Sequence, residues 1–245
     1  MPQNVSLLIL YTMKKKYTHI FFDLDNTLWD FKNNSRLAMQ NSFHHFKLGD
    51  QQITFDEYFE VYSKHNHALW DAYRKKAVNK KDLIQRRFKD TFTELGVAGV
   101  DSEKINDYYF DEMPKQKTLY PGAIETLEYL KERRYQLFII TNGFKEVQHK
   151  KIDISGLKPF FKKVFTSEEV KTPKPGKEIF EFAITSTNAK KSESLMIGDD
   201  WDVDIKGAIN FEIDSVYFSQ QKPTTKVGKA TVFSISHLNE LMTVL

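Results

Sequence analysis

The sequence has no cysteine, and its positive and negative charges nearly cancel. Across 245 residues, 36 Lys and Arg side chains are balanced by 33 Asp and Glu side chains, which leaves a net charge of +3. The lack of cysteine excludes disulfide bonds, thiolate zinc sites and cysteine nucleophiles, and it suits a reducing, cytoplasmic compartment. The mild charge balance gives no support for a nucleic-acid partner, because Lys and Arg are scattered along the chain.

Long hydrophobic runs are also lacking. The run Ser6–Tyr11 is far too short to span a membrane. No positively charged side chain precedes it, as a secretory signal would require. We therefore expect no membrane partner. Residues 1–12 are predicted to form an N-terminal tail, with Met13 as a second candidate for the natural start.

What the chain does contain is an alternation of short apolar runs and helical patterns. The first run, Tyr17–Asp25, ends in two acids, and Pro121-Gly122 opens a helix that extends to Arg134. Alternating strands and helices predict parallel strand–helix–strand units, and therefore an α/β fold with a doubly wound parallel sheet. The later strand candidates are Gln136–Ile140, Lys163–Phe165, Leu195–Ile197, Ser215–Phe218 and Thr231–Phe233. The later helix candidates are Glu146–Ile154, Gly176–Thr187, Asp202–Asn210 and His237–Leu245.

Residues 32–114 interrupt this alternation, because they contain no convincing strand. Thr54 and Glu57 form a capping box at the start of one helical stripe, and a second stripe stops at Gly96. A third helix is expected before Pro114. The predicted organisation is an all-helical module at 32–114 inserted into a core formed by 13–31 and 115–245. Gln220–Thr225 is expected to be a polar loop.

Two aspartates, Asp23 and Asp25, end the first predicted strand. Residues two apart on a strand share a face, so both carboxylates are expected to point into one crevice. Carboxylates held close together need a cation, or one of them must take up a proton. That arrangement suits phosphoryl transfer, in which one carboxylate attacks phosphorus and the other handles the proton of the leaving group. Taken alone, the pair is better explained as a strand end that caps a helix.

Two further segments follow predicted strands and carry polar groups. Thr141, Asn142 and Gly143 offer a hydroxyl and backbone N–H groups to phosphate oxygens, although helix capping would explain them equally well. Lys174 stands between Pro173 and Pro175, which stiffen its backbone. A rigidly held ammonium group suits a phosphoryl oxygen and the Asp23 carboxylate, whereas a single loop lysine is more often just solvated.

Four aspartates follow the apolar run that ends at Ile197, and their density calls for a counter-ion. Carboxylate oxygens without His or Cys favour Mg²⁺ over zinc. We expect Asp202 to be an ordinary acid at a helix N-terminus and Asp199 to be a metal ligand. The four acids are Asp199, Asp200, Asp202 and Asp204.

Taken together and in this order, the four segments resemble the motifs of the haloacid dehalogenase-like (HAD) superfamily of phosphohydrolases. The resemblance implies a Rossmann-like core with a helical cap of the C1 type. It also implies that Asp23 is the nucleophile that forms an aspartyl phosphate, that Asp25 is the general acid and base, and that Lys174 neutralises charge. The family's dehalogenases lack a carboxylate at the position of Asp25, so this residue favours phosphatase chemistry over dehalogenation.

The remaining implied roles concern the metal ion and the phosphoryl group. The resemblance places Mg²⁺ on Asp23, on the main-chain carbonyl of Asp25 and on Asp199. The resemblance implies that Asp204 is not a metal ligand itself but supports the metal site or Lys174 from behind the direct ligands. The implied ligands of the phosphoryl group are Thr141, Asn142 and Gly143.

A narrower resemblance links the chain to the bacterial pyrimidine 5′-nucleotidases of the YjjG type. It rests on three segments: Thr141–Phe144, Ser167–Val170 and Asn66–Tyr73. It implies a nucleoside monophosphate such as UMP or dTMP as substrate. A base could then stack on aromatic side chains, although Trp70 fits the interior of the helical module slightly better. The candidates for stacking are Trp29, Phe31, Trp70 and Tyr73.

Other interpretations of the same motifs stay open. The substrate could be another small metabolite, such as phosphoglycolate or a sugar phosphate. A phosphomutase would return the phosphoryl group to a second hydroxyl of a sugar phosphate instead of to water. A non-catalytic phospholigand-binding protein would be expected to have lost Asp23 or Asp25. The sequence does not define the oligomeric state.

Overall fold

The computed structural model describes residues 17–219, 225–227 and 229–245, which form two compact units. Among the described residues, the core unit comprises 17–31 and those from Thr118 to Leu245, and the helical unit is Lys32–Lys117. The second boundary therefore lies three residues beyond the predicted end of the helical module at 114. The tail predicted at residues 1–12 lies outside the described residues.

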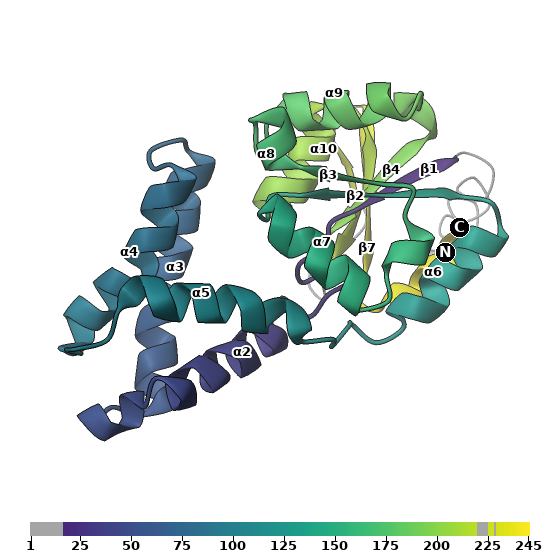
Figure 1. Cartoon of the computed structure of the whole chain (residues 1–245). Coiled ribbons are helices and arrows are strands. Elements are labelled where there is room, and N and C mark those ends of the chain that lie inside the picture. The colour runs from purple at the N-terminus through teal and green to yellow at the C-terminus, as the bar shows by residue number, and fades with distance from the viewer. Residues whose placement is uncertain (1–16, 220–224, 228) are drawn as a thin grey trace. The chain divides into compact units, whose positions relative to one another are not determined.

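The core unit is built on a seven-stranded sheet in the order β3-β2-β1-β4-β5-β7-β6. All of its pairs are parallel except β6–β7. This is the predicted α/β, Rossmann-like, doubly wound fold, with β1 inside the sheet (Figure 1). The strands are β1 (His19–Phe22), β2 (Gln136–Thr141), β3 (Lys163–Thr166), β4 (Ser194–Gly198), β5 (Asp214–Phe218), β6 (Thr225–Val227) and β7 (Ala230–Ile235).

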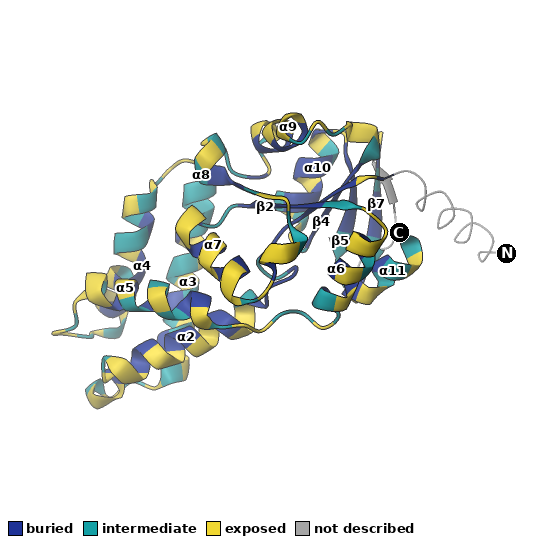
Figure 2. Cartoon of the chain, turned by 45° about the vertical axis from the view of Figure 1, so that its right-hand side comes forward, coloured by how far each residue is buried: buried dark blue, intermediate teal, exposed yellow. Residues whose placement is uncertain are grey.

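Helices cover both faces of the sheet. Helices α9 and α10 lie on one face, and α6 and α7 lie on the other (Figure 1), where α11 packs against α6 (Figure 2). The strands between them are almost entirely buried, while the helices present exposed residues outward (Figure 2). The helices of the core unit are α6 (Ala123–Glu132), α7 (Lys145–Ile154), α8 (Ser167–Val170), α9 (Lys177–Ser186), α10 (Lys206–Asn210) and α11 (Leu241–Val244).

Large apolar side chains fill the space between the sheet and α9. Phe21 pairs in register with Phe138 on β2 and with Met196 on β4, so the central strands place one apolar row on this face. Phe180 of α9 is fully buried in the same cluster. Truncating such a phenylalanine to alanine typically costs about 3–5 kcal/mol. This packing fixes the strand ends, and hence the polar side chains that follow them.

The helical unit begins inside a helix that the sequence pattern did not reveal, α2 (Phe31–His45). Its buried face mixes polar with apolar residues, which weakens the apolar period that marks a helix in sequence. The buried residues are Asn34, Ser35, Ala38, Met39, Ser42 and Phe43. The predicted capping box of Thr54 and Glu57 is present at the start of the next helix. The other helices of this unit are α3 (Phe55–Arg74), α4 (Lys80–Leu95) and α5 (Ser102–Glu112).

Short turns of helix complete both units. The predicted helix at Asp202–Asn210 contains such a turn, since its first half is a π turn and only its second half is α-helical. The 3₁₀ turns are η1 (Leu48–Gln51), η2 (Met113–Lys115), η3 (Lys158–Phe160), η4 (Lys191–Glu193) and η6 (Leu238–Glu240), and the π turn is η5 (Trp201–Ile205).

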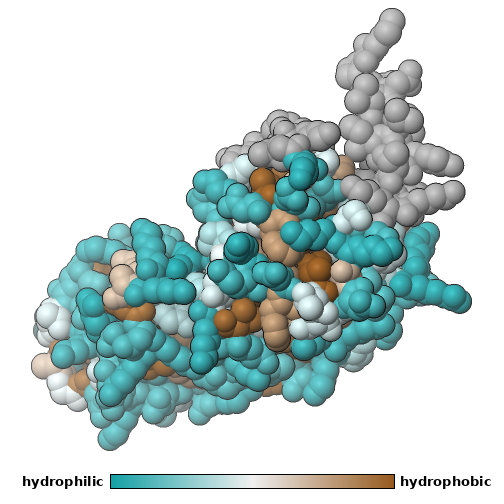
Figure 3. Space-filling model, turned by 90° about the horizontal axis from the view of Figure 1, so that it is seen from above, coloured by the Kyte–Doolittle hydropathy of each residue, from teal (hydrophilic) through white to brown (hydrophobic). Residues whose placement is uncertain are grey.

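On the face shown in Figure 3, hydrophobic residues form small patches among hydrophilic ones. Large hydrophobic side chains that stand exposed include Leu37, Ile154 and Phe182. Within the described part of the chain, no helix combines the length and the hydrophobicity that crossing a membrane would take.

Candidate active site

Asp23 and Asp25 leave the sheet at the carboxyl end of β1. The main chain stays extended through Asp23, whose N–H donates to the carbonyl oxygen of Ile197 on β4 at 2.8 Å. It then turns at Asn26, which has a φ of 62°. Asparagine tolerates this left-handed conformation better than most residues. The Asp23 side chain is buried, whereas the side chain of Asp25 keeps 25% of its surface exposed.

The ammonium group of Lys174 is held by three acceptors in the buried interior. Its Nζ donates to Oδ1 of Asp23 at 2.6 Å, to Oδ1 of Asp204 at 2.6 Å and to the carbonyl oxygen of Ile140 at 2.7 Å. An ammonium group has three donors, so this set satisfies it completely. Burial alone would lower the pKa of Lys174, but the charges of Asp204 and Asp23 outweigh burial and raise it. The lysine therefore stays cationic beside Asp23.

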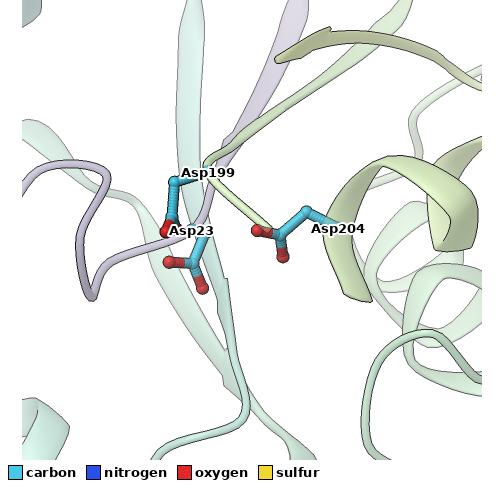
Figure 4. A group of neighbouring side chains, drawn as sticks. All are labelled: Asp23, Asp199 and Asp204. Carbon is cyan, nitrogen blue, oxygen red and sulfur yellow. The ribbon is translucent and has the colours of Figure 1, made fainter. Parts of the chain in front are cut away.

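Three carboxylates converge beside this lysine. One oxygen each of Asp23, Asp199 and Asp204 lie within 4.8 Å of one another, and Figure 4 shows the three side chains turned toward a common point. Gly198 makes room for this approach, since a Cβ atom built there would overlap the Asp204 carboxylate. The hydroxyl of Thr27 donates to Oδ1 of Asp199 at 3.2 Å and orients it.

This concentration of negative charge changes the acidity of the carboxyl groups. Burial raises the pKa of Asp199 to about 7, and the nearby charge of Asp204 adds to the effect. Burial also raises the pKa of Asp23, although Lys174 opposes the shift. Like charges in a dry site favour protonation unless a cation compensates them. The cluster is therefore suited to a divalent cation that takes oxygen ligands.

The four aspartates after β4 divide into different roles. Asp204 already bonds to Lys174, and its Oδ2 accepts from the N–H of Asp200 at 3.2 Å. Asp200 caps the turn that follows, because its Oδ1 accepts from the N–H groups of residues 202 and 203 at 2.9 and 3.0 Å. Asp202 is exposed and pairs with Lys206 at 2.5 Å, in keeping with its predicted place at a helix start. Asp23 and Asp199 thus have the carboxylate oxygens least committed to protein partners.

The segment after β2 is arranged around the Thr141 hydroxyl. Its Oγ1 accepts from the N–H of Gly143 at 3.1 Å and from Nε2 of Gln148 at 2.7 Å. Because both bonds use the oxygen as acceptor, the hydroxyl proton is left to donate elsewhere. The Asn142 side chain has another task, since it bonds to both main-chain groups of Lys174 at 2.8 and 3.0 Å. It thereby fixes the loop that carries the lysine.

Two residues that contact Asp25 were not found from the sequence. Nζ of Lys151 donates to Oδ1 of Asp25 at 2.6 Å, and Nε2 of Gln148 donates to Oδ2 at 2.9 Å. Both side chains are buried on α7. A signal was available, because these polar residues stand three apart and share a helix face with the apolar Val147 and Ile152.

The aromatic residues proposed for base stacking lie in both units. Trp29 is fully buried, and Nζ of Lys151 lies 4.3 Å from its ring centroid. The Trp29 ring therefore packs in the core unit, and the half-buried Phe31 is the member of this pair with exposed surface. In the helical unit, the rings of Trp70 and Tyr73 meet edge to face with centroids 5.6 Å apart, and both are half-buried. Stacking of a base on any of these rings stays a prediction.

A pocket of about 370 Å³ opens beside Asp199 in the core unit. Asn26, Tyr120, Phe218 and His237 also line it. Its volume falls within the usual range for small-molecule sites. Asp199 is therefore the member of the carboxylate cluster that faces this pocket.

The comparisons with known proteins agree with this geometry. A family model described as haloacid dehalogenase-like hydrolase matches residues 17–212. The chain therefore belongs to the haloacid dehalogenase-like hydrolases. Its fold is the one that the resemblance implied.

Individual relatives differ in what their names say they act on. Pyrimidine 5′-nucleotidase YjjG from Escherichia coli is 32% identical over 228 residues, with 92% of this chain and 96% of YjjG covered. Glyceraldehyde 3-phosphate phosphatase from Pyrococcus furiosus is 30% identical over 207 residues, with 83% and 81% covered. A crystal structure of the HAD-hydrolase YfnB from Bacillus subtilis bound to magnesium has a TM-score of 0.80 at 28% identity, and covers 93% of this chain and 97% of its own.

Proposed function

We propose that this hydrolase is a phosphatase for small phosphate monoesters, with Asp23 as nucleophile and Asp25 as general acid and base. The observation that carries the proposal is the buried bond of 2.6 Å between Nζ of Lys174 and Oδ1 of Asp23. It leaves the second oxygen of Asp23 to attack phosphorus and supplies a cation where charge builds up on the phosphoryl group. The Thr141 hydroxyl and the main-chain N–H groups of Asn142 and Gly143 would donate to phosphoryl oxygens.

The proposed reaction has two steps. In the first, an oxygen of Asp23 forms a bond to phosphorus while the ester P–O bond breaks, and Asp25 gives its proton to the leaving oxygen. In the second, the ionised Asp25 takes a proton from water, whose oxygen attacks the aspartyl phosphate. The P–O bond to Asp23 then breaks, phosphate leaves, and both carboxyl groups return to their starting states. Lys174 balances the negative charge of Asp23 between turnovers.

The residues present fit a bound Mg²⁺ ion. We propose that Asp23, Asp199 and the main-chain carbonyl of Asp25 would hold it, since both oxygens of Asp204 already accept hydrogen bonds, from Lys174 and from the N–H of Asp200. When bound, the ion would withdraw charge from the transferring phosphoryl group. The raised pKa values of Asp23 and Asp199 support the proposal, because burial and mutual repulsion disfavour their ionised forms until a cation compensates them.

The proposed substrate is a pyrimidine nucleoside monophosphate. Its support is the 32% identity with a pyrimidine 5′-nucleotidase over 92% of this chain. The relative named glyceraldehyde 3-phosphate phosphatase supports a second candidate function, a phosphatase of small sugar phosphates. A phosphomutase stays a third interpretation, marked by an isomeric product and little free phosphate. The expected cytoplasmic location rests on the sequence alone.

Phosphate release from a panel of monoesters tests both levels of the proposal. The panel is UMP, dTMP, AMP, phosphoglycolate and a three-carbon sugar phosphate, each assayed with Mg²⁺ and with EDTA. We expect UMP and dTMP to be preferred, and Asp23→Asn to lower every rate by a factor on the order of 10⁴. Asp202→Asn is the matched control, since Asp202 is exposed and pairs with a surface lysine one helix turn away.

The outcomes separate the general proposal from the specific one. Equal rates on all five esters would remove the nucleotidase assignment and leave the phosphatase. Failure of the wild-type protein to release phosphate from any ester, or rates that Asp23→Asn leaves unchanged, would refute the phosphatase itself.

A further inference from the structure

Helix α7 directs two buried polar side chains, one turn apart, at the carboxyl group of Asp25. The side chain of Lys151 is 2% exposed and Gln148 is completely buried. Burying an ammonium group is costly unless it is paired and hydrogen-bonded. Lys151 meets that requirement with Asp25, whose Oδ1 lies 2.6 Å from its Nζ. This pairing occupies one of the two oxygens of the predicted general acid.

The ring of Trp29 holds the lysine in place from another side. Nζ of Lys151 lies 4.3 Å from the centroid of that ring and 5.2 Å from the centroid of Phe31. A cation over an aromatic face is attracted to it, most strongly when both are buried. The ammonium group is therefore confined between aromatic rings and the Asp25 carboxylate, and the direction of its bond to Asp25 is restricted.

Gln148 connects Asp25 with the hydroxyl of Thr141. Its Nε2 donates to Oδ2 of Asp25 at 2.9 Å and to Oγ1 of Thr141 at 2.7 Å. The absence of a side chain at Gly143 permits this position, because a Cβ atom there would overlap the Gln148 amide. Since the amide oxygen Oε1 is buried without a hydrogen-bond partner among the described residues, the bonds made by Nε2 are what hold this side chain.

We propose that Lys151 and Gln148 are positioning residues, which fix the Asp25 carboxyl group for proton transfer and align the Thr141 hydroxyl with it. The inference rests on the proposed phosphatase function and extends it. Each oxygen of Asp25 is bonded to one of the two side chains, so the carboxyl group cannot rotate freely. Gln148 bonds to both Asp25, which protonates the leaving oxygen, and Thr141, which binds a phosphoryl oxygen. It thereby fixes the position of these two groups relative to each other.

A poor leaving group reveals the role of Lys151. An alkoxide needs a proton as its bond to phosphorus breaks, whereas p-nitrophenolate leaves readily without one. We expect Lys151→Met to lower kcat/KM for UMP and glycerol 2-phosphate roughly 10²-fold, and for p-nitrophenyl phosphate less than tenfold. Lys151→Arg should recover much of the loss, because it keeps the cation. Lys150→Met, at the adjacent exposed position of α7, should leave both values unchanged.

Gln148→Met tests the second half of the proposal. It keeps the length of the side chain but removes both donated hydrogen bonds. It should therefore lower kcat/KM more for the alkyl esters than for p-nitrophenyl phosphate, as Lys151→Met does. In addition, it should weaken inhibition by inorganic phosphate several-fold, because the Thr141 hydroxyl loses a bond that orients it. Lys151→Met should change phosphate inhibition much less, since Lys151 has no bond to Thr141. Circular dichroism and a melting curve establish that each variant is folded.

The results distinguish this inference from the proposed function. If the wild-type protein releases no phosphate from any of the three esters, the proposed function itself fails. If the wild-type protein is active and the folded variants at 148 and 151 lose the same factor on alkyl and aryl esters, the positioning roles are refuted. If Lys151→Met does not fold, the losses of Gln148→Met on alkyl and aryl esters decide between these outcomes. Gln148 is uncharged, so its replacement leaves no buried charge without a partner.

Discussion

Replacing Lys174 with methionine should destabilise the core unit strongly, even though the two side chains are similar in length. The substitution removes three short bonds, to Asp23, to Asp204 and to the carbonyl oxygen of Ile140. It leaves two buried carboxylates facing each other without their cation. Breaking a buried ion pair by removing one partner typically costs about 3–5 kcal/mol. At roughly 2–4 °C per kcal/mol for a chain of this size, the melting temperature should fall by about 6–20 °C.

Urea unfolding and thermal melting followed by circular dichroism measure this loss. Lys177→Met is the matched control, because Lys177 is an exposed lysine at the first position of α9, and its replacement should change stability by less than about 0.5 kcal/mol. The double variant Lys174→Met/Asp204→Asn should lose less than the two single variants together, by about 1 kcal/mol or more, because the second change removes a charge left unpaired by the first.

Two results would refute this account of Lys174. If Lys174→Met cost no more than the Lys177→Met control, the buried ammonium group would not be held as the three distances imply. If instead the two single losses simply added in the double variant, Lys174 and Asp204 would not interact. Either result would also remove the physical basis for a charge-balancing role of Lys174 in phosphoryl transfer.

Three further predictions concern other parts of the molecule. The buried hydroxyl of Tyr17 donates to Oδ2 of Asp214 at 2.6 Å, so Tyr17→Phe should cost about 1–3 kcal/mol in urea unfolding. Burial raises the pKa of Tyr17 above its ordinary value of 10.0. The contribution of the neutral Tyr17 hydroxyl to stability is therefore complete below pH 10 and is lost as the pH rises further. Tyr17→Phe should accordingly lose less stability between pH 9 and pH 11 than the wild type. Saturating Mg²⁺ should raise the melting temperature of the wild type, with about 2.7 kcal/mol of stabilisation at 100 times Kd, and Asp199→Asn should abolish most of that shift. Arg87 is buried in the helical unit and donates twice to Oδ1 of Asn106, at 2.9 and 2.6 Å, so Arg87→Met should speed amide hydrogen exchange in α4 and α5 without a comparable change in the core strands.

The sequence predicted the strands well because most of them are buried on both faces. An apolar run such as Leu195–Ile197 is short, is bounded by polar residues and lies in the centre of the sheet, where burial dominates every other preference. The edge strand β6 was missed, since Thr225–Val227 follows a polar segment and was included in part in a predicted loop. Its pairing with β7 depends on a partner strand that no local pattern describes.

The candidate site was predictable to the extent that its residues follow strands. Asp23 and Lys174 come from segments far apart in the sequence, yet the parallel sheet brings the ends of its strands to one edge. Asn142 was expected to bind the phosphoryl group, which stays a prediction, and the structure adds that its side chain holds the main chain of Lys174. Gln148 and Lys151 share a helix face with apolar residues, which indicates that they are buried, but no local pattern indicates that Asp25 lies opposite them.

The charges of the site provide an independent argument for its proposed chemistry. Its hydrogen-bonded and clustered charged groups are the carboxylates of Asp23, Asp25, Asp199 and Asp204 and the ammonium groups of Lys151 and Lys174. When all of them are ionised, the set carries two negative charges, which a divalent cation would neutralise. A phosphate monoester then brings negative charge into a neutral site, and a proton on one carboxyl group reduces the resulting excess. Asp25 lies outside the metal-binding cluster and keeps an exposed surface toward which a leaving oxygen can lie, so it is the carboxyl group placed to exchange a proton with that oxygen in the proposed reaction. The charge balance of the site therefore favours a divalent cation beside Asp23 and Asp199, and the position of Asp25 fits the proposed general acid.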